Sequence, residues 1–532
     1  MKNPQRGADE TGKLHPAAIF ALLFCLVLLL HSSLLRLPYF WDEAGYYIPA
    51  ARDLLLKGSV IPHSTPSNAH PPLVMAYLAL WWKVIGFAPL ITRIAILAIA
   101  AFSLTGLFLL ARRVANFEVA CGSTLCSAVY PVFFTQSSLA HPDLAAAGLT
   151  FWALWAYAES RWRAMALWFS LAVLAKETAI LAPMALLVWE LLRARIFPPR
   201  STANDSAPKS WLFLLPLIPL GFWYAYHYHQ TGFVFGNPEF FRYNVQSTLH
   251  PLRILLAFLM RLWQTVGYLG LYVLTLAAAL SMRLPALDDA GKKRERIAPP
   301  MQFAFLAITV SYSVALAIVG GAELARYMLP VVPLVIVVSV STLRRRVRMW
   351  RGVIAIVVLA FVVALFVNPP YGFSLEDNLA YRDYIELHQQ AENFIETHYP
   401  KACVLTAWPA SDELSRGYLG YVKKPMKVFR IDDFTVEQLM SAREVQTQFN
   451  IALVFSTKYE PPHSIFDRLQ FWQEWKTRFF GYHRDAPADV AAELLGGRVV
   501  YRDRRNGQWI GLIEMQQAVE AQAVAKASES AP

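Results

Sequence analysis

Long uninterrupted apolar runs are the feature that most constrains how this chain can fold. Ala17–Leu30 reads AAIFALLFCLVLLL, and Val353–Val367 is a second run without a single charge. Runs approaching 20 apolar residues match the thickness of the hydrocarbon core of a bilayer. Only 16% of the 532 residues are charged, whereas soluble domains average about a quarter. The chain is therefore predicted to be a polytopic, all-α membrane protein.

About eleven transmembrane helices are predicted from these runs. We expect the first run to be a retained helix and not a cleaved signal peptide, because no small-residue cleavage site follows it. Residues 72–87 hold a lysine and paired tryptophans, which favour an interfacial helix over a span. The spans are expected near residues 16–35, 91–111, 117–137, 142–158, 163–176, 178–193, 211–228, 262–282, 301–320, 327–343 and 352–368.

Arginine and lysine mark alternate loops, and cytoplasmic loops carry that excess. The basic loops hold Arg112 and Arg113; Arg161 and Arg163; Arg193, Arg195, Arg200 and Lys209; Arg283, Lys292, Lys293, Arg294 and Arg296; and Arg344, Arg345, Arg346, Arg348 and Arg351. All of them fall on the side of the N-terminus, which is therefore predicted to be cytoplasmic. The net charge of +11 sits mostly in these loops, so it does not indicate a nucleic-acid partner. An odd span count places the C-terminus outside, in a multi-pass protein of the bacterial inner membrane.

The C-terminal part of the chain changes character after Asn368-Pro-Pro. Leu379–Tyr399 reads as an amphipathic helix, and short β-like runs alternate with helical stretches beyond it, which predicts a small α/β domain. The runs are Ala402–Ala407, Met426–Ile431, Ile451–Ser456, Arg498–Tyr501 and Trp509–Ile513. We thus expect a transmembrane domain over 1–368, a soluble extracytoplasmic α/β domain over 369–515 and a disordered tail over 516–532. The four cysteines have no zinc-binding or disulfide spacing.

Ionisable residues gather in the loops predicted to face outward. The first of these, residues 36–90, is too long to be a simple connector. The candidates are Asp42-Glu43 and His70 in that loop, His141-Pro-Asp143 in the second, Lys176-Glu177 in the third, and Glu323 with Arg326 in the fifth. A carboxylate can act as a base for an acceptor hydroxyl, and lysine or arginine can bind an anionic leaving group.

Each candidate also has a purely structural interpretation. Asp42-Glu43 and Asp143 could cap the helices that follow them, and Lys176-Glu177 could be a hairpin turn whose charges reach water. Arg326 could pair with Glu323 or extend toward the interface. The sequence alone leaves these alternatives open.

Four stretches resemble the GT-C fold glycosyltransferases, in the bacterial branch related to protein O-mannosyltransferases and lipid A aminoarabinose transferases. They are FWDEAGYYIPAARDLLLKGSVIP with NAHPPLVMAYLALWWKVIGFAPLITRIA in the first loop, YPVFFTQSSLAHPDLAAAGLTFWAL, LAVLAKETAILAPMALL and LARYMLPVVPLVIV. The resemblance covers roughly residues 15–345, in the family's order and spacing. The C-terminal domain carries no motif of the family.

The resemblance implies a role for each matching residue. Asp42 would be the catalytic base, Glu43 would orient the acceptor or a metal, and Asp143 matches the acidic residue of the second loop. The cations implied for the donor phosphate are Lys176, Arg326 and Arg93, and His70 stands where the family often has lysine. A metal site at Asp42, Asp143 and His141 is an open alternative, for Mg²⁺ or Mn²⁺ if carboxylates dominate and Zn²⁺ if the histidine binds.

The implied reaction moves a hexose or pentose from a polyprenyl-phosphate donor to a hydroxyl of a lipid, glycan or protein on the extracytoplasmic face. No cofactor is certain, and the expected partners are the donor, the acceptor and membrane lipids. The principal alternative is a transporter or flippase for a lipid-linked or amphiphilic substrate, which would place its ionisable residues near the middle of the bilayer.

Overall fold

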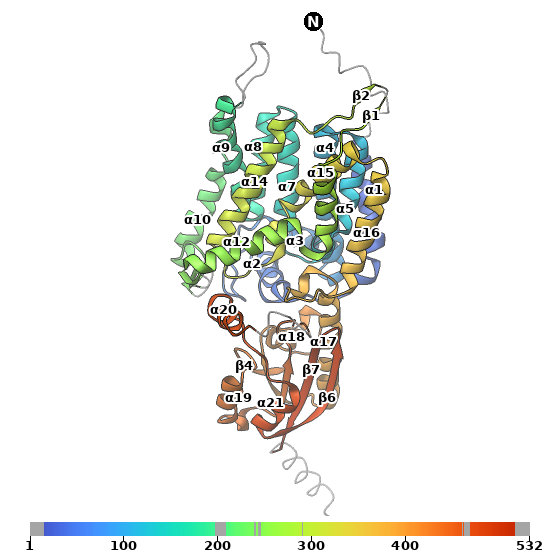
Figure 1. Ribbon diagram of the computed structural model, residues 1–532. Helices are drawn as coiled ribbons and strands as arrows, with labels where there is room; N and C mark the ends of the chain where they lie inside the picture. The colour runs from blue at the N-terminus through green and yellow to red at the C-terminus, as the bar shows by residue number, and fades with distance from the viewer. Residues whose placement is uncertain are drawn as a thin grey trace, which may run out of the picture.

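The computed structural model describes residues 15–196, 209–238, 241–242, 246–289, 291–459, 461 and 469–516. The tail predicted for 516–532 lies, apart from Gln516, outside these ranges. A helical bundle forms one part of the molecule, and a smaller part with a sheet lies against one end of it (Figure 1).

The bundle is built from helices that are mostly apolar on all sides. Its members are α1 (Pro16–Leu30), α4 (Pro89–Val114), α5 (Phe117–Val129), α6 (Pro131–Gln136), α7 (Pro142–Ala158), α8 (Trp162–Ala175), α9 (Leu181–Ile196), α10 (Leu217–Thr231), α12 (Pro251–Val266), α13 (Leu271–Ser281), α14 (Pro299–Ile318), α15 (Val332–Arg346) and α16 (Trp350–Phe366). Two helices of the first loop, α2 (Ile48–Lys57) and α3 (Leu73–Ile85), lie at the end of the bundle that faces the sheet. Prolines at the first turn start many of these helices, where the missing N–H costs nothing.

Three helical segments within the described ranges are long and apolar enough to cross a membrane by length and composition. They are Pro89–Val114, Pro251–Ser281 and Pro299–Ile318, and shorter apolar helices accompany them. The chain is a membrane protein, and the count of eleven spans remains a prediction.

The helix pattern departs from the sequence prediction around residues 251–282. The single span expected at 262–282 is two helices, α12 and α13, with a bend at Leu269 and Gly270, whose φ angles are 46° and 87°. Arg253 and Arg261 lie buried on one face of α12 and bind Glu323. These charges lower the local hydropathy, so the apolar run in the sequence starts only after the first part of α12.

The basic loops gather at the end of the bundle away from the sheet. Arg294 donates to the carbonyl of Arg344 at 2.7 Å, and Arg344 binds Glu118. The short hairpin of β1 (Asp288–Asp289) and β2 (Lys292–Lys293) lies at this same end, far from the C-terminal sheet (Figure 1). The described basic loops therefore share one end of the bundle, as the distribution of arginine and lysine predicted; Arg200 lies outside the described residues.

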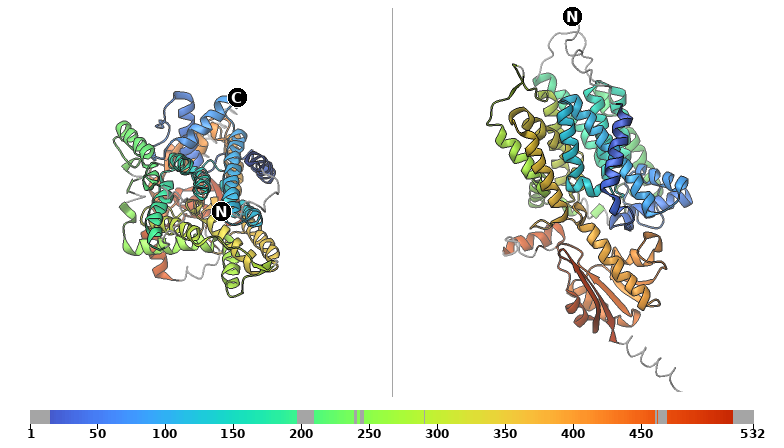
Figure 2. Two further views of the ribbon diagram at one scale, coloured as in Figure 1. Left: turned by 90° about the horizontal axis from the view of Figure 1, so that it is seen from above. Right: turned by 90° about the vertical axis from the view of Figure 1, so that its right-hand side faces the viewer.

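The C-terminal part is a five-stranded mixed sheet with helices packed on it (Figure 2). The strand order is β4-β3-β5-β7-β6, with β3 parallel to β4 and β5, and β7 antiparallel to β5 and β6. The predicted α/β pattern is confirmed at this level. The strands are β3 (Cys403–Ala407), β4 (Lys427–Ile431), β5 (Ile451–Phe455), β6 (Gly497–Arg505) and β7 (Gln508–Met515), and the helices are α17 (Ala380–His398), α18 (Ala410–Ser415), α19 (Val436–Arg443), α20 (Gln470–Phe480) and α21 (Ala488–Leu495).

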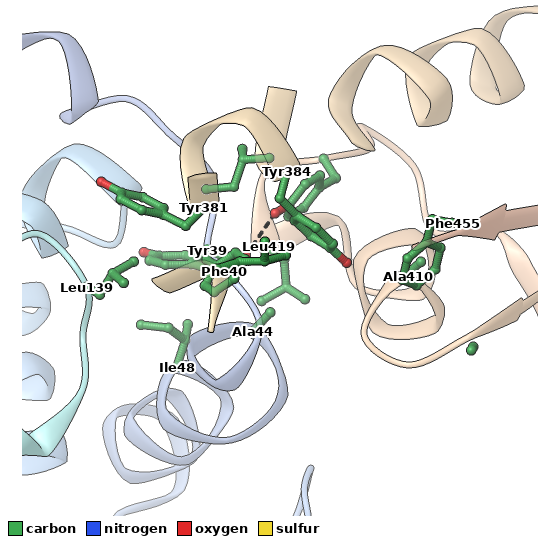
Figure 3. Close-up of a cluster of buried hydrophobic side chains, with 14 of the residues drawn as sticks. Tyr39, Phe40, Ala44, Ile48, Leu139, Tyr381, Tyr384, Ala410, Leu419 and Phe455 are labelled. Carbon is green, nitrogen blue, oxygen red and sulfur yellow. Dashed lines mark hydrogen bonds between the residues drawn. The ribbon is translucent and has the colours of Figure 1, made fainter. Parts of the chain in front are cut away.

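The first loop and the C-terminal part share one hydrophobic core. Tyr39 donates from its backbone to the carbonyl of Leu419 at 3.3 Å, and Tyr421 donates from its hydroxyl to the carbonyl of Tyr39 at 3.1 Å. The ring of Phe40 meets Tyr384 edge to face, with centroids 5.3 Å apart. Figure 3 shows these side chains of the loop lying among residues of α17 and of the segment around Leu419. The shared core fixes the sheet over the end of the bundle.

Candidate active site

A cavity of about 740 Å³ lies where the end of the bundle meets the C-terminal part. Its walls come from the first loop, from the segments around Lys176 and Arg326, and from residues 373–376 with Trp408 and Tyr459. Asp42 is a partly exposed charged group there, with 22% of its side chain accessible. The candidates from separate outer loops therefore meet in one place.

Arg326 is the centre of the site and is 1% exposed. Its Nη2 donates to Asp42, and its Nη1 donates to Glu376. Nη1 also lies 3.1 Å from Nδ1 of His141, and Nε lies 3.4 Å from Oδ2 of Asp143. One buried cation thus holds three carboxylates, which come from the first loop, the start of α7 and the segment before α17.

Lys176 is the second buried cation. Helix α8 ends at Ala175, and the extended backbone of Lys176 turns its side chain toward α7. Its Nζ donates to Oδ1 of Asp143 at 2.5 Å and lies 3.9 Å from the ring centre of Tyr327. Asp143 therefore lies between both cations, and its capping role at α7 is not supported by a side-chain hydrogen bond.

His70 and Glu177 pair at the same wall, with Nδ1 and Oε2 2.8 Å apart. Burial raises the pKa of Glu177, but the charges of His70 and Lys176 outweigh it and hold that pKa at about 2. His70 thus lines the cavity with a carboxylate partner already in place.

Glu43 and Arg93 differ from the roles that the resemblance implied for them. They form an ion pair whose side chains are 0% and 1% exposed, and neither lines the cavity. Glu43 also accepts from the backbone of Phe40 and of Ala140, and Arg93 donates to the carbonyl of Pro38. The pair is closed on itself and fixes the loop that carries Asp42, so we correct its assignment from substrate contact to positioning.

The backbone around Asp42 is unusual. Trp41 has a φ angle of 43°, a left-handed conformation that costs a non-glycine residue roughly 1 kcal/mol or more. Residues Glu43–Tyr47 then form a π-helical turn, a geometry frequent at functional sites. The turn directs Asp42 into the cavity and its neighbour Glu43 into the protein.

Glu376 is a charged member of the centre that the sequence did not single out. It lies in the short segment between α16 and α17, and burial raises its pKa to about 8, although Arg326 opposes the shift. Its neighbour Asp377 accepts from the hydroxyl of Tyr268 at 2.6 Å, and burial raises its pKa to about 7. Adjacent acidic residues directly after the last apolar run were the available signal.

The predicted metal site changes in composition. Ligand atoms of Asp42, His141 and Glu376 lie within 4.8 Å of one another, whereas the predicted Asp143 is not part of that group. Arg326 contacts all three of these side chains. Its guanidinium supplies the positive charge that a metal would bring, and a cation there would have to displace it. The residues therefore do not fit a resident metal, and we derive no step through one.

The molecule has known structural relatives. The structure of ArnT from Cupriavidus metallidurans bound to undecaprenyl phosphate matches with a TM-score of 0.56 and 13% identity, over 93% of this chain and 97% of that one. ArnT from the same organism in the apo state matches with a TM-score of 0.49 at 14% identity, covering 94% and 98%. An oligosaccharyltransferase from Archaeoglobus fulgidus in complex with Zn and sulfate matches at 0.44 and 12%, covering 82% and 67%. No protein-family model and no curated protein sequence matches the chain.

Fold and site together define a class of membrane protein: a helical bundle with an acidic and basic centre at one end, closed by a sheet. The match to the ArnT complex over nearly both whole chains shows that this chain shares the fold of that protein, the GT-C fold. The fold predicted from the sequence resemblance is confirmed.

Proposed function

We propose that this protein is a membrane glycosyltransferase that moves a sugar from a polyprenyl-phosphate donor to an acceptor hydroxyl. The observation that carries the proposal is the cavity in which Asp42, a partly exposed carboxylate, meets the buried cations Lys176 and Arg326. Such a pairing suits a base on one side of a sugar and a phosphate on the other. The bound undecaprenyl phosphate of the ArnT structure supports this donor class.

The proposed chemistry is a single displacement at the anomeric carbon. Asp42 takes the proton of the acceptor hydroxyl while that oxygen bonds to the anomeric carbon. The bond from the carbon to the phosphate oxygen breaks, and the polyprenyl phosphate leaves with the electron pair. Lys176 and Arg326 neutralise its charge, and a phosphate monoester with a second pKa of about 6 leaves without a strong general acid.

Arg326 links the two halves of this reaction. A phosphate that takes its Nη2 donor competes directly with Asp42 for the guanidinium. Loss of that ion pair leaves the carboxylate of Asp42 free to accept the proton of the acceptor hydroxyl. Donor binding thereby frees the base in the complex in which a base is needed.

The apolar part of the cavity suits the lipid portion of the donor. Leu316, Val319 and Leu324 line it beside Tyr224 and Phe235. The phosphate of a polyprenyl lipid lies at the membrane interface, level with the ends of the helices that hold Lys176 and Arg326. We propose that this end of the bundle is extracytoplasmic, that residues 369–515 form a domain closing the cavity on that side, and that the membrane is the bacterial inner membrane.

The transporter alternative predicts a different position for the ionisable residues. A transporter places them near the middle of the bilayer, on broken helices. Here Asp42, Asp143 and Arg326 stand at helix ends next to the sheet. That position favours surface chemistry over passage through the bilayer.

Transfer by the purified protein tests the proposal. Radiolabelled polyprenyl-phosphate sugars, carrying hexoses and pentoses, are incubated with cell-envelope acceptors, with wild type beside Asp42→Asn. We expect transfer by wild type and loss of about three orders of magnitude in the variant. Asp489→Asn, at an exposed carboxylate of α21, is the matched control and should retain activity. Full transfer by Asp42→Asn would contradict the assignment of Asp42 as the base. Transport of the substrate across proteoliposome membranes, without any sugar transfer, would show that the protein is a transporter and not an enzyme.

A further inference from the structure

A second cluster of metal-ligating side chains lies inside the C-terminal part, outside the cavity lining. His388 and Glu392 stand one turn apart on α17, and Glu413 lies on α18. Nδ1 of His388 is 2.7 Å from Oε2 of Glu413 and 3.7 Å from Oε1 of Glu392. One ligand atom from each residue lies within 4.8 Å of the other two.

The cluster is fully buried and incompletely paired. The side chains of His388, Glu392 and Glu413 are 0–1% exposed. Within the described residues, neither oxygen of Glu392 accepts a hydrogen bond, and neither Oε1 of Glu413 nor Nε2 of His388 has a partner. Buried polar atoms are almost always paired, so four without partners in one place require a reason.

Among the described residues, no lysine or arginine forms an ion pair with Glu392 or Glu413, and His388 is the ion-pair partner of both glutamates. Tyr384 stacks on the imidazole with centroids 3.9 Å apart, and Phe455 meets it edge to face at 4.6 Å. Paired buried carboxylates carry a desolvation cost that a divalent cation would remove.

We propose that His388, Glu392 and Glu413 bind a structural zinc ion. A neutral imidazole and two carboxylates give a neutral site with a divalent cation, and the imidazole favours zinc over magnesium or calcium. Ligand atoms around a tetrahedral zinc lie roughly 3.3 Å apart, and the observed 2.7 Å and 3.7 Å bracket that separation. No group of this cluster takes part in the proposed transfer reaction.

The ion would join the two helices behind one wall of the cavity. Helix α18 starts at Ala410, two residues after Trp408. The ring of Trp408 lines the cavity and packs edge to face on Trp41, with centroids 5.3 Å apart. Fixing α18 to α17 therefore holds Trp408 in place from behind. The residues of the cluster act as positioning residues, through Trp408 and not on the substrate.

Measuring the metal content distinguishes a zinc-bound cluster from the main alternative, a metal-free cluster in which the two glutamates share a proton. In the competing state Glu392 keeps a proton and shares it with Glu413, because burial raises the pKa of Glu392 well above its ordinary value. The full-length protein, purified without added metal or chelator, is analysed by inductively coupled plasma mass spectrometry beside Glu392→Gln and His388→Gln. We expect about one zinc ion per chain in wild type and its loss in both variants.

Two further measurements test whether the zinc is bound by this cluster and not by the Asp42, His141 and Glu376 group. His141→Gln removes a ligand of the Asp42, His141 and Glu376 group and is expected to retain the zinc. Chelator should lower the thermal unfolding temperature of wild type and leave that of Glu392→Gln unchanged, with gel filtration confirming that each variant is folded. Wild type without zinc, or zinc that persists in Glu392→Gln and disappears in His141→Gln, would overturn the proposal.

Discussion

The guanidinium of Arg326 donates a hydrogen bond to the carboxylate of Asp42, joining two residues 284 positions apart. The contact links the loop after the first helix to the short 3₁₀ turn Ala325–Met328, which precedes α15. Asp42, the proposed base, and the phosphate of the donor would therefore compete for the same guanidinium of Arg326.

Arg326 should therefore be hard to replace. We expect Arg326→Gln to lower the transfer rate by about 10²–10³ and to cost about 3–5 kcal/mol of unfolding free energy, because its buried carboxylates lose their cation. Arg326→Lys should be intermediate, since one ammonium cannot reach Asp42, Asp143 and Glu376 together. Transfer rates and thermal unfolding measure both effects; equal activity of wild type and Arg326→Gln contradicts the assignment.

His70 is predicted to contact the donor phosphate. His70→Lys places a cation beside Glu177 and should retain most activity, whereas His70→Ala should raise the donor KM about tenfold, the effect of one lost hydrogen bond. His63→Ala, an exposed histidine of the same loop, is the control. A KM that rises as much in His70→Lys as in His70→Ala would show that charge is not the relevant property.

Stability should fall as the pH rises. Burial raises the folded-state pKa of Glu376 to about 8 and of Asp377 to about 7. The folded state then binds more protons than the unfolded state between roughly pH 4 and pH 8, so the free energy of unfolding declines across that window. Thermal unfolding at both ends of the window checks this. Glu376→Gln should show a weaker pH dependence, and an unchanged one rules out Glu376 as the source.

Gly45 is predicted to be intolerant of any side chain. A Cβ there would lie 2.7 Å from the ring of Trp408. Gly45→Ala should therefore cost about 1–3 kcal/mol and lower transfer by displacing Trp408. Gly221→Ala on α10 meets nothing within 4 Å and is the matched control. If Gly45→Ala unfolds and transfers sugar like wild type, the turn at Gly45 and the segment at Trp408 are not packed as tightly as this contact implies.

Much of the site could be predicted because membrane topology is readable from loop charge. Once alternate loops were assigned to one side, Asp42, Asp143, Lys176 and Arg326 had to share the other end of the bundle. Loop charge indicates on which side of the membrane a residue lies, but not the direction in which its side chain points. It could not tell which of the adjacent Asp42 and Glu43 faces the cavity, since the turn of Glu43–Tyr47 depends on tertiary packing.

The remaining differences have equally local causes. Glu376 was missed because nothing in the sequence after α16 shows that the segment folds back beneath Arg326. Helix α12 was missed because Arg253 and Arg261 interrupt its apolar run, although their spacing of eight residues places them on one helical face. The α/β pattern of the C-terminal part was recognisable because its strands are short, apolar and well separated.

The core shared by the first loop and the C-terminal part has a consequence for biogenesis. Tyr39 and Phe40 are synthesised early, but their partners Tyr384 and Leu419 are in the last third of the chain to leave the ribosome. The loop that carries Asp42 cannot reach its final packing until that last segment has been synthesised. A truncated or stalled chain is thus left without a completed site, which ties completion of the site to the end of synthesis.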